Sequence, residues 1–253
     1  MRWQALVLAG ERPEGDPLAA TEGVPAKAFI DIAGQPMIAH VLKTLSDVPT
    51  IETISVSVSP DAPALPSGPW RRLAAAPGPS ASVREGFDAL GGAPLLVTTA
   101  DHPLLRPATV EDFLKRAAAT GAAAIAGIAR GQVAAQPPGA PPRTILRFRD
   151  GGVGGCNLFA LVRPEASGVV DFWQRLEVMR KRPAALALAI GPLTAASFQF
   201  GRLTLANAEK ALARKTGVAV ATVMLDDPLA LHDVDKPAHL AFARERLRDR
   251  HPR

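Results

Sequence analysis

The sequence predicts a three-layer α/β/α fold around a mixed, mostly parallel sheet, and three observations lead to this prediction. Continuous apolar runs at residues 3–9 and 95–100 are typical of parallel strands that are buried on both faces. Helical segments alternate with these runs, as in βαβ units. Hydrophobic residues make up 47% of the chain and charged residues 21%, which is close to ordinary globular usage and argues against disorder or a coiled coil.

Local patterns predict the individual elements in chain order. The first strand ends at Gly10, and Gly34-Gln35-Pro36 introduces a helix with apolar residues at the 3.6-residue period. Ser82 occupies an N-cap-like position, and the glycines at 151–155 predict a hairpin or a bulged turn. Strands are expected at 3–9, 28–32, 54–58, 95–100, 122–129, 144–148, 156–161 and 218–223, and helices at 38–45, 83–90, 108–120, 169–180, 205–215 and 237–253, with two short ones within 183–201.

Length and composition limit the domain organisation and the partners. We expect one domain over residues 1–253, with residues 164–216 as a helical insertion or subdomain, because no linker or repeat interrupts the chain. No nucleic-acid partner is expected, because aromatic residues are 5% of the chain and a stacking platform is absent. Cys156 is the one cysteine and no export signal is visible, so a cytoplasmic location is expected.

The glycine loop after the first strand is a candidate phosphate-binding element, because backbone N–H groups beyond a strand can hold phosphate. The dinucleotide fingerprint G-x-G-x-x-G fails here, since Glu11 and Arg12 follow Gly10. The P-loop pattern G-x-x-x-x-G-K-[ST] also fails, since Asp16-Pro17 stands where a lysine and a hydroxyl residue are required. Neither common nucleotide motif therefore explains this loop.

A third arrangement fits the loop better, and it consists of Leu8-Ala9-Gly10, Arg12, Lys27 and Gly34-Gln35-Pro36. This opening resembles that of the GT-A-like nucleotidyltransferases, the superfamily of the MobA-like NTP transferases and the sugar-phosphate nucleotidyltransferases. The resemblance implies a nucleotide-diphospho-sugar-transferase-like fold in which Leu8, Ala9 and Gly10 wrap the triphosphate of an NTP. It also implies that Lys27 and Arg12 are catalytic cations that stabilise the developing negative charge.

Asp101 follows the apolar strand at 95–100, at the sheet edge where α/β folds bind ligands. A carboxylate at this edge suits Mg²⁺ or Mn²⁺, although an Asp before Pro103 is also a common turn or N-cap residue. Asp101-His102-Pro103-Leu104 resembles the family's Asp-x-Pro-Leu metal motif. The resemblance implies a catalytic and metal-binding role for Asp101 and a nucleotide contact for Thr99, whereas His102 is expected to be a solvated neighbour or a minor substrate contact.

All but two of the remaining candidates belong to three segments that also resemble the family. Asp233-Val234-Asp235 matches the closing motif and implies a second metal ligand, and the sequence leaves open which aspartate supplies it. Ser80 and Ser82 match a segment beside the base and ribose, although Ser82 is also typical of a plain helix N-cap, and the two roles can coexist. Asn157 matches a Gly-x-Asn strand on the acceptor side. Arg143 and Arg147 are candidate acceptor ligands, with a solvated strand face as the alternative.

The resemblance implies Mg²⁺-dependent transfer of an NMP from an NTP to a phosphorylated acceptor, sugar-like or lipid-like, with release of pyrophosphate. CTP and GTP are the candidate donors. Two alternatives stay open: a GT-A glycosyltransferase that uses a nucleotide sugar, and a catalytically degenerate nucleotide-binding or regulatory protein, since Glu11 stands where a second glycine is usual. The basic and apolar segment 172–202 is expected to contact an anionic membrane surface or to carry cations that complement helix ends.

Overall fold

Helices and strands alternate along the chain, of which the computed structural model describes residues 1–11, 14–131, 136–179 and 182–250. The strands are β1 (Trp3–Ala9), β2 (Asp31–Ile32), β3 (Gln35–Pro36), β4 (Ile51–Val58), β5 (Trp70–Ala74), β6 (Leu95–Thr99), β7 (Ala124–Arg130), β8 (Leu146–Phe148), β9 (Gly151–Leu161) and β10 (Val220–Leu225). The helices are α1 (Pro17–Thr21), α2 (Met37–Ser46), α3 (Pro79–Ala89), α4 (Pro107–Ala119), α5 (Ser167–Met179), α6 (Pro183–Ile190), α7 (Pro192–Gln199), α8 (Leu205–Thr216) and α9 (Pro237–Arg250).

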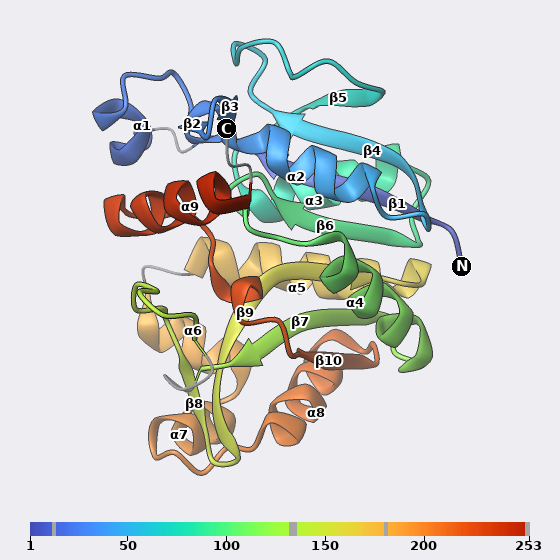
Figure 1. Ribbon diagram of the computed structural model, residues 1–253. Coiled ribbons are helices and arrows are strands. Elements are labelled where there is room, and N and C mark those ends of the chain that lie inside the picture. The colour runs from blue at the N-terminus through green and yellow to red at the C-terminus, as the bar shows by residue number, and fades with distance from the viewer. Residues whose placement is uncertain (12–13, 132–135, 180–181, 251–253) are drawn as a thin grey trace.

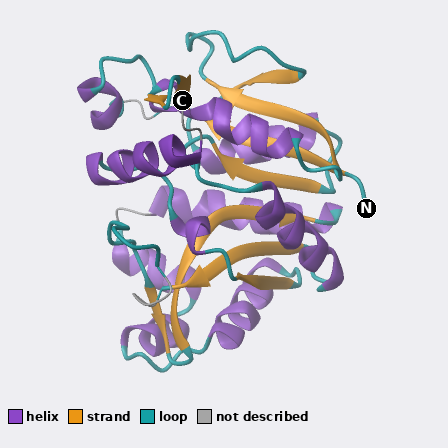
Figure 2. Cartoon of the chain, in the orientation of Figure 1, coloured by secondary structure: helices purple, strands orange, loops and turns teal. Residues whose placement is uncertain are grey.

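A single mixed sheet forms the centre of the described structure, with the strand order β10-β7-β9-β6-β1-β4-β5 and with β8 paired to β9. Neighbouring strands are parallel except that β9 runs antiparallel to β6, β7 and β8. Helices cover both faces of the sheet (Figure 1), and the strands form a layer between them (Figure 2). This arrangement confirms the predicted three-layer α/β/α fold.

The sheet buries apolar side chains on both faces, which explains why its central strands are continuous apolar runs. On one face, Val7 of β1 packs in a cluster with Phe113 of α4 and apolar residues of α2. On the other face, Leu6 packs with Phe87 of α3 and with α5. A third cluster joins α9 to α1 and to β2, so α9 packs beside the segment that follows β1. Each fully buried large apolar side chain contributes roughly 1.5–3 kcal/mol.

The structure corrects several local predictions. Residues 28–32 do not form one strand, because Lys27–Phe29 is a 3₁₀ turn that precedes the short β2–β3 hairpin. The sequence did not predict β5, which pairs parallel with β4. Ser82 is not an N-cap, because α3 already begins at Pro79 with Gly78 as its cap. The predicted hairpin is present, since β8 pairs antiparallel with β9, but the glycines at 151–155 lie within β9 and not in the turn that precedes it.

Helices α5 to α8 occupy most of the segment 164–216. Its long uncharged stretch forms two short helices, α6 and α7, as predicted. Whether this segment is a subdomain stays a prediction. Large apolar side chains of α6, α7 and the residue after them point to solvent, with exposed fractions of 70% for Leu188, 84% for Leu193 and 75% for Phe200. Among the helices that the structure describes, none combines the length and apolar character needed to cross a bilayer.

Candidate active site

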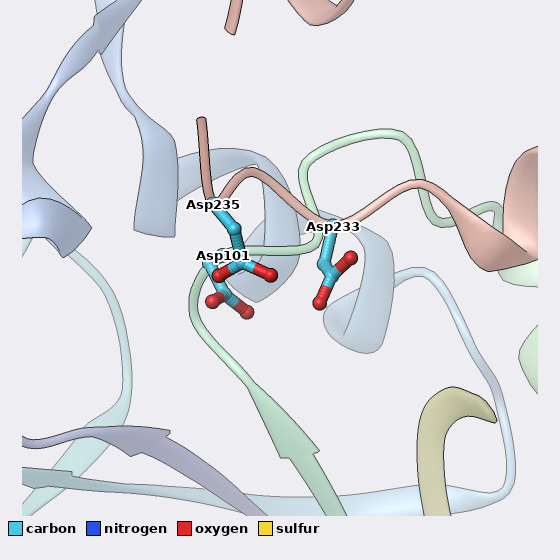
Figure 3. Close-up of side chains that lie close together, drawn as sticks. All are labelled: Asp101, Asp233 and Asp235. Carbon is cyan, nitrogen blue, oxygen red and sulfur yellow. The ribbon is translucent and has the colours of Figure 1, made fainter. Parts of the chain in front are cut away.

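Three aspartates from two distant segments meet at the carboxyl edge of the central parallel strands. Asp101 comes just after β6, and Asp233 and Asp235 lie on the segment that leads into α9. The backbone N–H of Val234 donates to the carbonyl oxygen of Asp101 at 2.7 Å, which fastens the two segments together. One carboxylate oxygen of each aspartate lies within 4.8 Å of the others, and Figure 3 shows the three side chains together. The structure therefore brings both candidates for the second carboxylate to Asp101.

Lys27 lies between two of these carboxylates. Its Nζ atom donates to Asp101 Oδ2 at 2.5 Å and to Asp235 Oδ1 at 2.9 Å. Burial lowers the pKa of Lys27, but the negative charges of Asp101 and Asp235 outweigh this effect, so the pKa is raised above its ordinary value. For Asp235 the signs are reversed. Burial raises its pKa, but the positive charge of Lys27 outweighs burial and holds the pKa below its ordinary range. Lys27 is therefore a fixed positive charge of the site.

The aspartate cluster fits a divalent cation by its chemistry. Oδ1 of Asp101 is buried and accepts no hydrogen bond from the described residues. Such an atom is costly to bury unless a ligand or water supplies its partner. Carboxylate oxygens are the ligands that Mg²⁺ and Mn²⁺ prefer. Asp101, Asp233 and Asp235 would hold the cation, with Lys27 beside them.

Two side chains from the predicted acceptor side orient Asp233. Arg143 forms an ion pair with the Asp233 carboxylate and donates to its backbone carbonyl oxygen at 2.9 Å. Asn157 Nδ2 donates to Asp233 Oδ2 at 2.9 Å. Asn157 has a φ of 50°, a left-handed conformation that asparagine tolerates better than most residues, and the β7–β9 pairing is irregular around it. This irregularity in β9 accompanies a side chain directed toward the aspartates.

Two histidines, His239 and His102, pack behind this corner, and the sequence did not mark His239 as a site residue. Arg143 Nη1 donates to His239 Nδ1 at 2.7 Å, so Nδ1 of His239 must be unprotonated. Burial lowers the pKa of His239, and the positive charge of Arg143 lowers it further. His102 is only 1% exposed, which corrects the expectation of a solvated neighbour, and its burial lowers its pKa. His239 thus contacts the arginine that holds Asp233, and its Nδ1 atom also accepts the backbone N–H of Asp235 at 3.3 Å.

A pocket of about 250 Å³ opens beside Lys27 and Asp101. Five residues predicted to bind the nucleotide line it, namely Leu8, Ala9, Gly10, Ser82 and Thr99. Ser82 lies under the loop before α3, where its Oγ accepts from the backbone N–H of Ala76 at 3.0 Å. The Thr99 hydroxyl is buried and has no hydrogen-bond partner among the described residues. The glycine turn, Lys27 and Asp101 thus border one space.

Two predicted site residues are not part of this arrangement, and a third lies outside the described residues. Ser80 does not line the pocket, because it is buried and its hydroxyl donates to Glu177 of α5. Arg147 is exposed on β8 and forms no hydrogen bond or ion pair with the described aspartates, so its acceptor role stays a prediction. Arg12 lies outside the described residues.

The pocket is strongly acidic for one that would hold a triphosphate. Lys27 is the one cation among the described residues that line it, against carboxylates at Glu11, Glu14, Asp16, Asp101 and Glu177. Negative phosphate oxygens and these carboxylates would repel one another unless further positive charge enters with the ligand. The charge balance of the pocket therefore favours a nucleotide that binds together with a divalent cation.

The fold, the glycine turn and the acidic cluster define a class of α/β transferase that acts on nucleoside triphosphates. The family model of the MobA-like NTP transferase domain matches residues 5–152, so the chain belongs to this family. The protein is accordingly an enzyme, a nucleotidyltransferase, which confirms the resemblance seen in the sequence. No curated protein sequence matches the chain.

Solved structures agree with this assignment. A hypothetical transferase of Thermus thermophilus is 28% identical, with a TM-score of 0.81 over 95% of this chain and 100% of that one. A CMP:2-keto-3-deoxy-manno-octonic acid synthetase in complex with CTP is 16% identical, with a TM-score of 0.62 over 99% of this chain and 100% of the other. The 2-C-methyl-D-erythritol 4-phosphate cytidylyltransferase of Thermus thermophilus is 15% identical, with a TM-score of 0.56 over 98% and 100%. The last two show similarity of fold.

Proposed function

We propose that the protein transfers an NMP from an NTP to a phosphorylated small-molecule acceptor, with Mg²⁺ or Mn²⁺ as its metal, and releases pyrophosphate. One observation carries the proposal: Asp101, Asp233, Asp235 and Lys27 converge beside the pocket that Gly10 lines. The similarity in fold to a synthetase solved with CTP and to a cytidylyltransferase supports CTP as one candidate donor, and GTP remains the other.

In this reaction an acceptor oxygen forms a bond to the α-phosphorus of the NTP, and the bond from that phosphorus to the bridging oxygen breaks. The electron pair leaves on pyrophosphate. The backbone of the Gly10 turn and the Lys27 ammonium stabilise charge on the phosphate oxygens. Asn157 and Arg143 position an anionic acceptor next to Asp233. Asp101, Asp233 and Asp235 would hold Mg²⁺, which would supply positive charge to offset the negative charge of the phosphates.

The proposal is tested by pyrophosphate release from the purified protein with Mg²⁺, each NTP and a panel of sugar phosphates and lipid phosphates. At least one pair is expected to give product. If NTPs bind but no pair reacts, the degenerate nucleotide-binding alternative holds. If no NTP raises the melting temperature, the nucleotide function itself is wrong. Turnover of a nucleotide sugar instead of an NTP would support the glycosyltransferase alternative, which the NTP transferase family match disfavours.

Replacement of Asn157 by glycine is expected to raise the KM for the acceptor by about tenfold and to leave the KM for the NTP nearly unchanged. Glycine accepts the φ of 50° at this position, so the change removes the amide without adding backbone strain. Steady-state kinetics with each substrate varied in turn measures the effect. An equal rise in both KM values would contradict the acceptor role.

We also propose that α6, α7 and the residues after them rest on an anionic membrane surface. Leu193 and Phe200 are exposed, and the exposed Arg182 and Arg202 flank them. The sequence contains no acidic residue between Glu177 and Glu209. Cationic segments with exposed apolar side chains bind anionic lipid. The protein is expected to co-sediment with phosphatidylglycerol vesicles and F200S to bind more weakly, whereas equal binding to neutral phosphatidylcholine vesicles, or none, would contradict the proposal.

A further inference from the structure

Glu177 is a carboxylate of the nucleotide pocket that comes from outside the part of the chain matched by the family model. The match ends at residue 152, whereas Glu177 lies near the end of α5. It lines the pocket together with the loop residues 76–78 and with Pro79 and Ser82 of α3. Its role therefore has to be inferred from its own surroundings.

One oxygen of this carboxylate is fixed by the protein. Glu177 Oε2 accepts the backbone N–H of Ser80 at 3.1 Å and also the Ser80 hydroxyl. Gly78 makes room for the other oxygen, since a Cβ at that position would lie 2.8 Å from Glu177 Oε1. Gly78 has an ordinary extended backbone with a φ of −160°, so the close approach of the carboxylate, rather than the backbone conformation, requires glycine there. Residues of α3 and the loop before it thus hold Glu177 in one place.

The second oxygen of Glu177 is left to accept a hydrogen bond from a ligand. Among the described residues, Ser80 is the one donor to Glu177, and Glu177 forms no ion pair. A carboxylate is an acceptor with no donor of its own. It also repels phosphate, which places the triphosphate by Lys27 and Gly10 and leaves the ribose and the base as the parts of the nucleotide that Glu177 can meet. Of these two parts, the base is the one that differs from one NTP to another.

We propose that Glu177 reads the base of the NTP and selects bases with an exocyclic amino group, namely cytosine, adenine and guanine. The amino group donates a hydrogen bond to Oε1. Uracil and thymine present carbonyl oxygens in place of an amino group, and their N3–H lies between two such oxygens that repel the carboxylate. One well-placed hydrogen bond of this kind discriminates between bases by about 10- to 100-fold. This inference rests on the proposed nucleotidyltransfer reaction.

The test compares kcat/KM for CTP, ATP, GTP and UTP in wild-type protein and in E177Q, by pyrophosphate release. We expect UTP to be disfavoured by about tenfold or more against the best amino-bearing base in wild type. In E177Q this preference should fall by about tenfold, because the glutamine amide can donate to the carbonyl oxygen of uracil. Comparable use of UTP by the wild-type protein would overturn the proposal.

A purely structural role of Glu177 as a link between α3 and α5 predicts a different pattern. D171N serves as the matched control, because Asp171 of α5 forms an ion pair with Arg84 of α3 at 3.1 Å and does not line the pocket. D171N is expected to keep the base preference. A uniform loss for all four nucleotides in E177Q would show a structural role or a contact with the ribose that all four share, and either would overturn the proposal.

The same comparison separates this inference from the proposed reaction. If no acceptor supports turnover, calorimetric binding of the four nucleotides with Mg²⁺ replaces the kinetic readout, and equal binding by wild-type protein overturns base selection alone. Failure of every nucleotide to bind overturns both proposals.

Discussion

Pyrophosphate release is expected to fall by about 1,000-fold or more when Asp101 is replaced by asparagine. Asparagine keeps the size of the side chain but removes the charge that lies against Lys27 and beside Asp233 and Asp235. The fold should survive, because the backbone carbonyl of residue 101 still accepts from Val234. A coupled pyrophosphate assay at saturating NTP measures the loss.

Asp61 offers a matched control for this variant. It is an exposed aspartate in the loop after β4, so D61N is expected to keep wild-type turnover. D101N should retain a normal circular dichroism spectrum. Activity of D101N within tenfold of wild type would contradict the role assigned to the aspartate cluster.

The largest loss of stability is expected for D227N, at about 2–3 kcal/mol at pH 7. Asp227 is buried after β10, where Arg106 Nη2 pairs with its Oδ1 at 2.6 Å and the backbone N–H of Leu229 donates to the same oxygen at 2.9 Å. The Thr109 hydroxyl of α4 donates to the other oxygen. Asparagine cannot accept all of these bonds and leaves Arg106 without its counter-charge. Urea denaturation of both proteins measures the difference.

The pH dependence of this difference follows from the pKa of Asp227. Burial raises the pKa of Asp227, but the hydrogen bonds from Arg106 and Thr109 outweigh burial and hold the pKa below its ordinary range. A depressed folded-state pKa contributes stability above the unfolded-state value of about 4, and this contribution is lost as the pH falls through the folded-state pKa. The gap between wild type and D227N should therefore shrink below about pH 4. A difference in stability between wild type and D227N that stays constant to pH 3 would refute this account. So would an equal loss of stability in D226N, which changes the exposed neighbouring aspartate.

The fold could be predicted to a large extent because its central strands are buried on both faces. Such strands leave a continuous apolar run, and β1 accordingly has the predicted bounds. β5 gave no such signal, because it is an edge strand with exposed arginines at positions 71 and 72. The 3₁₀ turn at Lys27 could not be predicted either, since a segment of three residues is too short to show a hydrophobic periodicity.

The site was only partly predictable, because motifs in the sequence indicate some of its residues, whereas tertiary packing alone brings the others to it. Asp101 could be marked as a candidate because it follows a buried strand, and Asp233 and Asp235 because their segment resembles the closing motif of the family. The structure brings the three together. His239 and Glu177 could not be marked. Their partners, Arg143 and Ser80, lie about a hundred residues away in the chain, and only the folded packing joins them.

Binding of Mn²⁺, followed by electron paramagnetic resonance with a non-hydrolysable NTP analogue present, tests the central arrangement most directly. If Asp101 and the closing aspartates hold one cation beside the glycine turn, wild-type protein will bind one Mn²⁺ per chain, and D101N will bind it about 100-fold more weakly. Equal Mn²⁺ affinity in wild type, D101N and D233N would contradict the account.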